Sequence, residues 1–244
     1  DGVVRYQGGS NAGHTVVVNG ISYKLQLLPS GILYKDKLCI VGNGTAIDPA
    51  HLIKEIQGMI DKGVDVSALR ISDRAHVVFP WHKAQDILEE EAKGDDKIGT
   101  TKNGIGPCYM DKNARIGLRI CDLMDSEDFP ATFRRIFDQK ATHLKDSYGY
   151  TELNHDEILK NYQTYADFLH PFVTDTLEVL NDAIDRGDKI VFEGAQATLL
   201  DLDHGTYPYV TSSHPIAGGA CVGAGVGPSN INKVVGVVKA YATR

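Results

Sequence analysis

The chain has 244 residues, of which 42% are hydrophobic and 23% are charged, and its formal net charge is −7. This composition is typical of a soluble globular protein with a buried core, and the acidic balance argues against broad binding to the phosphate backbone of nucleic acids. No apolar run approaches the roughly 18 residues that span a bilayer, so we expect no membrane partner. The four cysteines form neither a CxxC pair nor a zinc-binding pattern, which suits a reducing, cytoplasmic compartment.

Strand and helix patterns alternate in the first part of the chain. Short apolar runs predict strands at 3–6, 38–41, 69–72 and 76–79. Asp48 can cap a helix that has Pro49 at its first position and ends near Gly63. Residues 81–93 predict a second, acidic helix.

The middle of the chain is predicted to be helical. Ser126 can cap a helix that carries apolar residues up to 137. Apolar positions at helical spacing fill residues 156–186, and Pro171 divides that run into two helices. Further strands are predicted at 189–192 and 234–241. The pattern predicts an α/β fold with a mainly parallel central sheet flanked by helices, and with a helical subregion.

The two ends of the chain both resemble core strands that are already under way. We therefore expect residues 1–244 to form one domain that is truncated at both ends.

The first segment that could bind a ligand or take part in catalysis follows the first predicted strand and runs from Gly8 to Thr15. Its small residues let a ligand approach the backbone closely, and Asn11 and Thr15 add side-chain hydrogen bonds. His14 can donate to a phosphate group or act as a general acid near neutral pH. The alternative, a glycine-rich turn with a solvated histidine, stays open.

The second segment covers residues 98–115 and combines several glycines with threonine hydroxyls and cationic side chains. Thr100 and Thr101 are the threonines, and Lys112 and Arg115 are the cations that we single out. Arginine presents a planar fork of donors that suits phosphate. An exposed basic loop without a ligand is the alternative.

The third segment covers residues 192–213. The amide of Gln196 both donates and accepts, so it could read the edge of a purine, and residues 211–213 could bind phosphate oxygens. A metal site is one interpretation of three neighbouring side chains, Asp201, Asp203 and His204. We favour the alternative that they fix the loop itself.

A fourth glycine-rich run, at 223–227, only loosely resembles a dinucleotide-binding fingerprint, and no GxxxxGK[ST] phosphate loop occurs.

Together, these segments resemble the adenylosuccinate synthetases. The pentapeptide NAGHT occupies 11–15, and GIGPxYxxKxxR occupies 104–115 without a mismatch. FEGAQ and LLDxDHGTYPYVTSS fall within 192–213, with Ala197 and Leu202 as mild variants. Three long motifs in the family's order argue strongly against a chance match. Lys102-Asn103 stands where many members have Gly-Arg, so any role of an arginine there is lost or moved.

The resemblance implies a P-loop-NTPase-like fold and the GTP-dependent ligation of L-aspartate to IMP. In that reaction the γ-phosphoryl group of GTP moves to O6 of IMP, and the aspartate amine then displaces phosphate. The products are adenylosuccinate, GDP and phosphate, in de novo AMP synthesis. The resemblance also implies Mg²⁺ as cofactor and a homodimer.

The same resemblance assigns roles to individual residues. His14 is the catalytic acid, and the backbone carbonyl of Gly13 is a ligand of Mg²⁺. The implied GTP contacts are Gly13, His14 and Thr15. The implied IMP contacts are Asn11, Ala12, Gly13, His14, Thr101, Arg115, Gln196 and Thr211. Arg115 would reach the IMP site of the partner subunit.

The family has a phosphate loop before the matching region, which supplies the base that acts on IMP, and later segments that bind aspartate and guanine. We expect these to lie outside the 244 residues, so that the chain alone is inactive. Two alternatives stay open. One is a non-catalytic purine-nucleotide-binding fragment, and the other is a different phosphoryl-transfer enzyme with a similar glycine loop.

Overall fold

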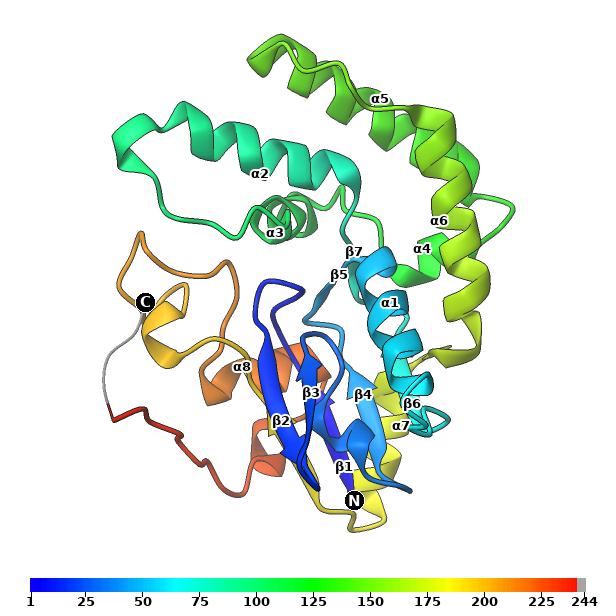
Figure 1. The fold of residues 1–244 in the computed structure, drawn as a ribbon, viewed down its shortest axis with the longest axis vertical. Helices are drawn as coiled ribbons and strands as arrows, with labels where there is room; N and C mark the ends of the chain where they lie inside the picture. The colour runs from blue at the N-terminus through cyan, green and yellow to red at the C-terminus, as the bar shows by residue number, and fades with distance from the viewer. Residues whose placement is uncertain (241–244) are drawn as a thin grey trace.

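The computed structural model describes residues 1–240, and its centre is a five-stranded parallel sheet (Figure 1). The strand order is β8-β6-β4-β1-β9, and every neighbouring pair is parallel. The strands are β1 (Gly2–Arg5), β4 (Leu38–Val41), β6 (Leu69–Ser72), β8 (Val173–Thr174) and β9 (Ile190–Glu193). Parallel neighbours need crossover connections. Helices lie in the connections that follow β4, β6 and β8, whereas a β-hairpin and a 3-10 turn connect β1 to β4.

Both faces of this sheet are covered. On one face, α7 (Thr176–Asp185) and α8 (Ala217–Ala224) pack against β1 and β4 through a small buried apolar cluster. In front of the other face lie α1 (Pro49–Ile60) and the hairpin of β2 (His14–Val18) and β3 (Ile21–Leu25) (Figure 1). Two short strands, β5 (Ala46–Ile47) and β7 (His76–Val77), pair separately.

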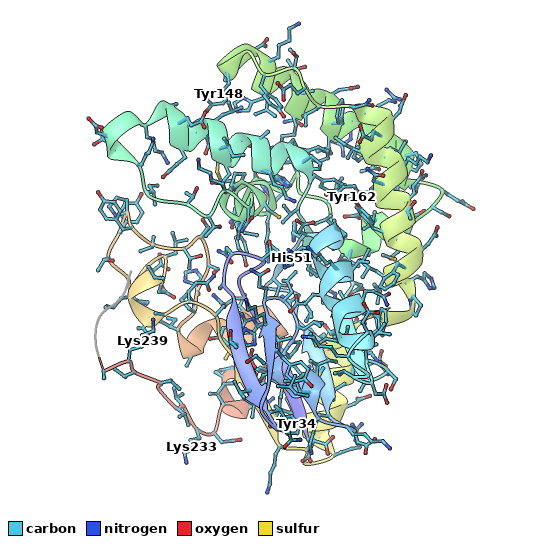
Figure 2. All side chains as sticks on the ribbon, in the orientation of Figure 1. Tyr34, His51, Tyr148, Tyr162, Lys233 and Lys239 are labelled. Atoms are coloured by element: carbon cyan, nitrogen blue, oxygen red, sulfur yellow. The ribbon has the colours of Figure 1, made fainter. Side chains whose placement is uncertain are left out.

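A helical subregion lies beyond the carboxyl ends of the strands (Figure 1). It consists of α2 (Pro80–Ala92), α3 (Ile105–Ala114), α4 (Ile120–Met124), α5 (Phe129–Tyr148) and α6 (His155–Leu169). Phe79, the residue before α2, ties α2 to α6, because its ring stacks on Trp81 and on Tyr162, each at a centroid distance of 4.3 Å. Tyr162 lies inward from α6 (Figure 2), and its hydroxyl donates to Val78 O at 2.6 Å. None of the helices within residues 1–240 combines the length and the apolar character that crossing a membrane requires.

The predicted fold class is confirmed, and so are most of its elements. Strands occupy 38–41 and 69–72 as predicted, and those at 2–5 and 190–193 differ from the prediction by one residue. Asp48 caps α1 by accepting from the His51 N–H at 3.3 Å, with Pro49 at the first helical position. Pro171 lies between α6 and α7, which it separates as expected.

The predicted cap at Ser126 is wrong. Helix α5 begins at Phe129 with Asp128 as its cap residue, and no side chain caps it. Asp125 shapes the turn instead, because its Oδ1 accepts from the N–H groups of Glu127 and Asp128. A carboxylate next to the serine therefore takes the donors that the serine was expected to bind.

Two strand predictions are also corrected. The strand expected at 76–79 is only His76–Val77, because Pro80 starts α2 directly afterwards. Residues 234–240 form no strand, and Tyr241 lies outside the described residues. The valines of this run are largely exposed, with Val237 at 97%. Among the described residues this apolar run has no neighbouring strand, so β-propensity alone mispredicts it.

Glycines let α8 approach the loops that follow β1 and β4. The N–H of Gly44 donates to Gly223 O at 2.9 Å. A Cβ placed on Gly223 would lie 2.0 Å from the carbonyl oxygen of Tyr6, so no larger residue fits there without moving the backbone. This contact fixes α8 behind the carboxyl end of β1.

We expect Gly223→Ala to lower the free energy of unfolding by about 1–3 kcal/mol, because the added methyl group overpacks a contact with a backbone atom. Gly218→Ala is the matched control in the same helix, since its Cβ would meet nothing closer than 4.0 Å. Urea unfolding of both variants checks this. Equal stabilities would show that the close approach of α8 does not constrain the fold.

Candidate functional site

The predicted site segments meet at the carboxyl edge of the sheet. β1 and β9 are adjacent, with Arg5 opposite Glu193 in the register, so the loops that follow them leave the sheet side by side. Ligand sites of open α/β sheets lie at this edge. The loop of residues 8–13 and the loop that starts at Gly194 are therefore neighbours.

Arg5 and Glu193 form a largely buried ion pair at the point where both strands end. Nη1 of Arg5 donates to Oε1 of Glu193 at 3.0 Å, and the arginine is only 3% exposed. The guanidinium also donates to three backbone carbonyls. These are Gly194 O at 3.3 Å, Gln26 O at 3.1 Å and Ala12 O at 3.4 Å. One side chain thus ties together the two site loops and the end of β3.

His14 lies beside this ion pair. Its Nε2 is 3.4 Å from Oε1 of Glu193, within ion-pair range but without hydrogen-bond geometry. Burial lowers the pKa of His14, Glu193 raises it and Arg5 lowers it, and the balance lies below the ordinary value of 6.5. The ring therefore favours its neutral form until further negative charge, such as a phosphate group, comes close.

Two of the predicted IMP contacts are in direct contact with each other. Nε2 of Gln196 donates to Oδ1 of Asn11 at 3.0 Å, and Gln196 adopts the left-handed conformation with φ 58°. Gln7 hydrogen-bonds to this pair through Gln196. Its Nε2 donates to Gln196 Oε1 at 2.8 Å and to Ser213 Oγ at 3.1 Å. Thr211, two residues before Ser213, therefore lies on a segment joined to the same network.

The loop that carries Thr101 is tied to this group of residues through its neighbour. Nδ2 of Asn103 donates to Ser10 O at 3.2 Å, which places the loop of residues 98–104 next to the loop of residues 8–13. Thr101 itself is exposed. Asn103 belongs to the Lys102-Asn103 departure from the family pattern, and here it joins two loops.

Arg115 is not brought to the rest of the site within one chain. It ends α3 in the left-handed conformation with φ 62°, whereas Thr101 precedes the start of that helix. A ten-residue helix is about 15 Å long, so the two residues lie at opposite ends of it. The side chain of Arg115 is exposed.

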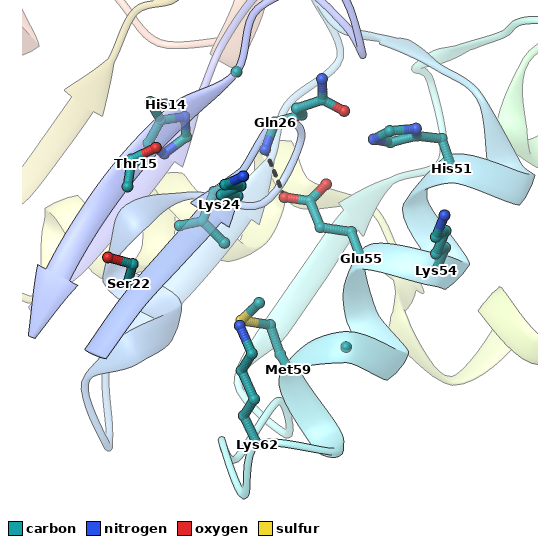
Figure 3. Close-up of a pocket in the computed structure, with 13 residues that line it drawn as sticks. His14, Thr15, Ser22, Lys24, Gln26, His51, Lys54, Glu55, Met59 and Lys62 are labelled. Carbon is teal, nitrogen blue, oxygen red and sulfur yellow. Dashed lines mark hydrogen bonds between the residues drawn. The ribbon is translucent and has the colours of Figure 1, made fainter.

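A cavity of about 660 Å³ lies between the β2–β3 hairpin and α1 (Figure 3). Gly13, His14 and Thr15, the residues expected to contact GTP, line it. Three lysines also line it, one on β3 and two on or just after α1: Lys24, Lys54 and Lys62. Several cations around one cavity favour an anionic ligand.

Glu55 is the acidic residue that faces this cavity, but its oxygens are already used. They accept from the backbone N–H groups of Gln26, Leu27 and Leu28 at 2.7, 3.0 and 3.2 Å, and the first contact is visible in Figure 3. Glu55 therefore fixes the end of β3 on α1. Its one negative charge is outnumbered by the three lysines, so the cavity keeps its cationic character.

The loop of residues 201–214 fits the interpretation that it fixes itself. Asp201 is fully buried, and its Oδ1 accepts from the N–H groups of Asp203 and His204 at 3.0 and 3.1 Å. Within residues 1–240, no group of three or more His, Cys, Asp or Glu side chains could hold a metal ion. The Gly13 carbonyl, the expected Mg²⁺ ligand, is an oxygen donor of the kind that this hard cation takes.

The run at 223–227 forms the end of α8 and the turn after it, not the strand–loop–helix unit of a dinucleotide site.

Sequence reasoning missed the polar residues that hold the loops from behind. Arg5, Gln7 and Glu193 are buried or half-buried and lie at strand ends. A charged residue that closes an apolar strand was the available signal in Arg5 and Glu193. The pairing of the two, however, depends on the register of β1 against β9. No pattern within either segment states that register.

His76 provides a pH test of the surroundings of α3. Burial, together with Lys112 and Arg119, lowers its pKa to about 4 from the ordinary 6.5. Because the folded pKa is lower, the unfolded chain binds the proton first, so this contribution to stability is present above pH 6.5 and is lost as the pH falls towards 4.

We expect the free energy of unfolding of the wild type to fall more steeply over this interval than that of His76→Gln, by up to about 1.4 kcal/mol per pH unit. Denaturant unfolding at a series of pH values measures it. His143→Asn, at an exposed histidine, is the control and keeps the wild-type slope. Identical slopes for His76→Gln and the wild type would contradict the assignment.

Comparison with known proteins gives a consistent answer. The sequence profile of adenylosuccinate synthetase matches residues 1–244. The chain is 60% identical over 242 residues to the adenylosuccinate synthetase of Brachyspira hyodysenteriae, and 57% identical over 244 residues to that of Caldanaerobacter subterraneus subsp. tengcongensis. Each match covers 99% of this chain but only 57% of the relative.

Solved structures agree with these relatives. The fully ligated adenylosuccinate synthetase of Plasmodium falciparum matches with a TM-score of 0.92 at 40% identity, over 100% of this chain and 57% of that one. A succinoaminodeoxyadenylate synthetase of cyanophage S-2L shares the fold alone, with a TM-score of 0.60 at 23% identity over 93% of this chain and 53% of that one. On the matched profile, the sequence identities and the first of these structures, the chain belongs to the adenylosuccinate synthetase family.

Proposed function

We propose that the protein is a GTP-dependent ligase that joins L-aspartate to IMP through a 6-phosphoryl-IMP intermediate. The observation that carries the proposal is the group formed by Asn11, Gln196 and His14, which the Arg5–Glu193 ion pair and Gln7 hold at one edge of the sheet. An amide that reads a purine, an amide beside it and a histidine beside a cationic cavity are the groups that this reaction needs.

We assign roles to the individual residues by resemblance to the family. Gln196 presents an amide to the purine base, and Asn11, Thr101 and Thr211 bind the phosphate of IMP through neutral polar groups. His14 donates a proton to an oxygen of the γ-phosphate as that group leaves GDP for O6 of IMP. Ala12 and Thr15 complete the contacts to IMP and GTP through the same loop.

Mg²⁺, when bound, neutralises charge on the phosphates of GTP, and the Gly13 carbonyl is the oxygen of this chain that we propose as its ligand. The four cysteines are free thiols, which is compatible with a reaction that we place in the cytoplasm.

The chain spans 57% of the length of the relatives it matches, so the activity is a proposal for the whole enzyme. By resemblance to the family, the base that deprotonates N1 of IMP belongs to a phosphate loop that precedes the matched segment. We infer that the 244 residues alone do not complete the reaction. A purine-nucleotide-binding fragment without turnover is the form that we expect for the isolated chain.

A chimera tests the function directly. The 244 residues replace the matched segment of the Brachyspira hyodysenteriae relative, and adenylosuccinate formation is measured with GTP, IMP and aspartate. We expect turnover in the chimera, none in the isolated chain, and a loss of about 10²–10⁴-fold in kcat for His14→Gln in the chimera, as for a general acid. A folded chimera that releases no IMP-dependent phosphate would contradict the proposal.

The shared-site homodimer can be tested with the same chimera. We propose that Arg115 reaches the IMP phosphate of the partner subunit, which agrees with its distance from Thr101 in its own chain. Arg115→Ala and His14→Ala should each be nearly inactive alone. Their mixture should regain about a quarter of the wild-type activity, because random pairing gives half hybrid dimers, each with one intact site. Absence of rescue, with hybrids shown to form, would exclude a shared site.

A further inference from the structure

Helix α2 presents two buried carboxylates that face the loop of residues 98–104. Asp86 is 7% exposed and Glu90 is 3% exposed. They are four residues apart, so they lie on the same face of the helix, one turn from each other. Neither carboxylate is among the residues described above for the candidate site.

Both carboxylates accept backbone N–H groups from this loop, one at each end of it. Oδ2 of Asp86 accepts from Gly104 N at 2.9 Å. Oε1 of Glu90 accepts from Gly99 N at 2.5 Å and from Thr100 N at 3.4 Å. Bonds from peptide N–H groups to a carboxylate are stronger than those between neutral groups. Helix α2 therefore holds both ends of the loop through hydrogen bonds to its backbone.

The loop needs this support because its backbone is unusual. Gly99, Lys102 and Gly104 all lie in the left-handed region, with φ of 83°, 58° and 74°. A lysine pays a steric cost of about 1–2 kcal/mol in that conformation, and such positions persist only where the surroundings hold them. The two carboxylates supply a fixed frame on either side of Lys102.

The charge state of Glu90 suits this role. Burial raises the pKa of Glu90, but the N–H donors of Gly99, Thr100 and Ile98 lower it by more, so its pKa lies below the ordinary value. Glu90 is therefore an acceptor with a full negative charge at neutral pH.

The loop is held by its backbone while the side chain of Thr101 stays exposed. Asn103 also ties it to Ser10. We propose that Asp86 and Glu90 are positioning residues, which hold the loop of residues 98–104 so that the Thr101 hydroxyl faces the phosphate of IMP. This inference rests on the proposed function, and its structural half can be tested without any ligand.

The ligand-free test is amide hydrogen exchange on the 244-residue chain. Glu90→Ala should speed exchange at Gly99 and Thr100 by about 10- to 100-fold, the effect of losing a hydrogen bond to a charged acceptor. Glu90→Gln keeps an acceptor without the charge and should give a smaller increase at the same two amides. Glu91→Ala removes an exposed carboxylate of the same helix and should change neither. Unchanged exchange at Gly99 and Thr100 in both Glu90 variants would overturn the proposal that Glu90 holds this loop.

The functional test uses the chimera. Glu90→Ala should raise the KM for IMP, while kcat and the KM values for GTP and aspartate stay near those of the wild type. Glu90→Gln should raise the KM for IMP by less than Glu90→Ala does. A general loss of structure would instead lower kcat and the unfolding temperature together. If Glu90→Ala does not fold, Glu90→Gln and Asp86→Asn carry the same comparison.

Thr101→Ala separates the two ideas. If it leaves the KM for IMP unchanged, the role proposed for Thr101 fails, whatever the loop does. If Thr101→Ala raises the KM but the Glu90 variants, with faster exchange, do not, the positioning inference alone is wrong.

Discussion

The buried ion pair of Arg5 and Glu193 is the interaction on which the site depends. It joins the last residues of two neighbouring parallel strands, and the same guanidinium donates to carbonyls at Ala12, Gln26 and Gly194. Glu193 is fully used as well, since its Oε2 accepts from the N–H and the hydroxyl of Ser30. A buried pair is costly to desolvate, and it persists here because nearly every donor and acceptor is matched. What it provides is one fixed geometry for several loops.

The same device recurs on a smaller scale around the site. Side chains that bind no ligand in our proposal hold the backbone of segments that do: Glu55 holds the end of β3, Asp201 holds the loop before Thr211, and Glu90 holds the loop before Thr101. In each case a carboxylate accepts two or more peptide N–H groups. Among the predicted ligand-binding side chains, Thr101 and Arg115 stay exposed, whereas Asn11 and Gln196 hydrogen-bond to each other. Helices α1 and α2 thus act as frames for the loops at the sheet edge.

The sequence predicted the local elements well, because strands such as 38–41 and the capped helix α1 carry their signals within a few residues. It pointed to Asn11, Thr101 and Gln196 through their side-chain chemistry and the family motifs, but nothing in their spacing shows that Asn11 and Gln196 touch. Arg5, Glu90 and Glu193 could not be found, because their partners are distant in sequence and are set by strand register and helix packing. The same limit explains the errors: Ser126 lost its donors to Asp125, and residues 234–240 have strand propensity without a described partner.

Hydrogen exchange measured by mass spectrometry in Arg5→Met tests the central claim most directly. Methionine keeps much of the side-chain volume but removes every donor of the guanidinium. If Arg5 organises the site, exchange should rise together in three segments, at 11–14, 26–30 and 194–196, while α5 and α6 keep their wild-type protection. A rise confined to residues next to position 5, or a rise in only one of these three segments, would contradict the account.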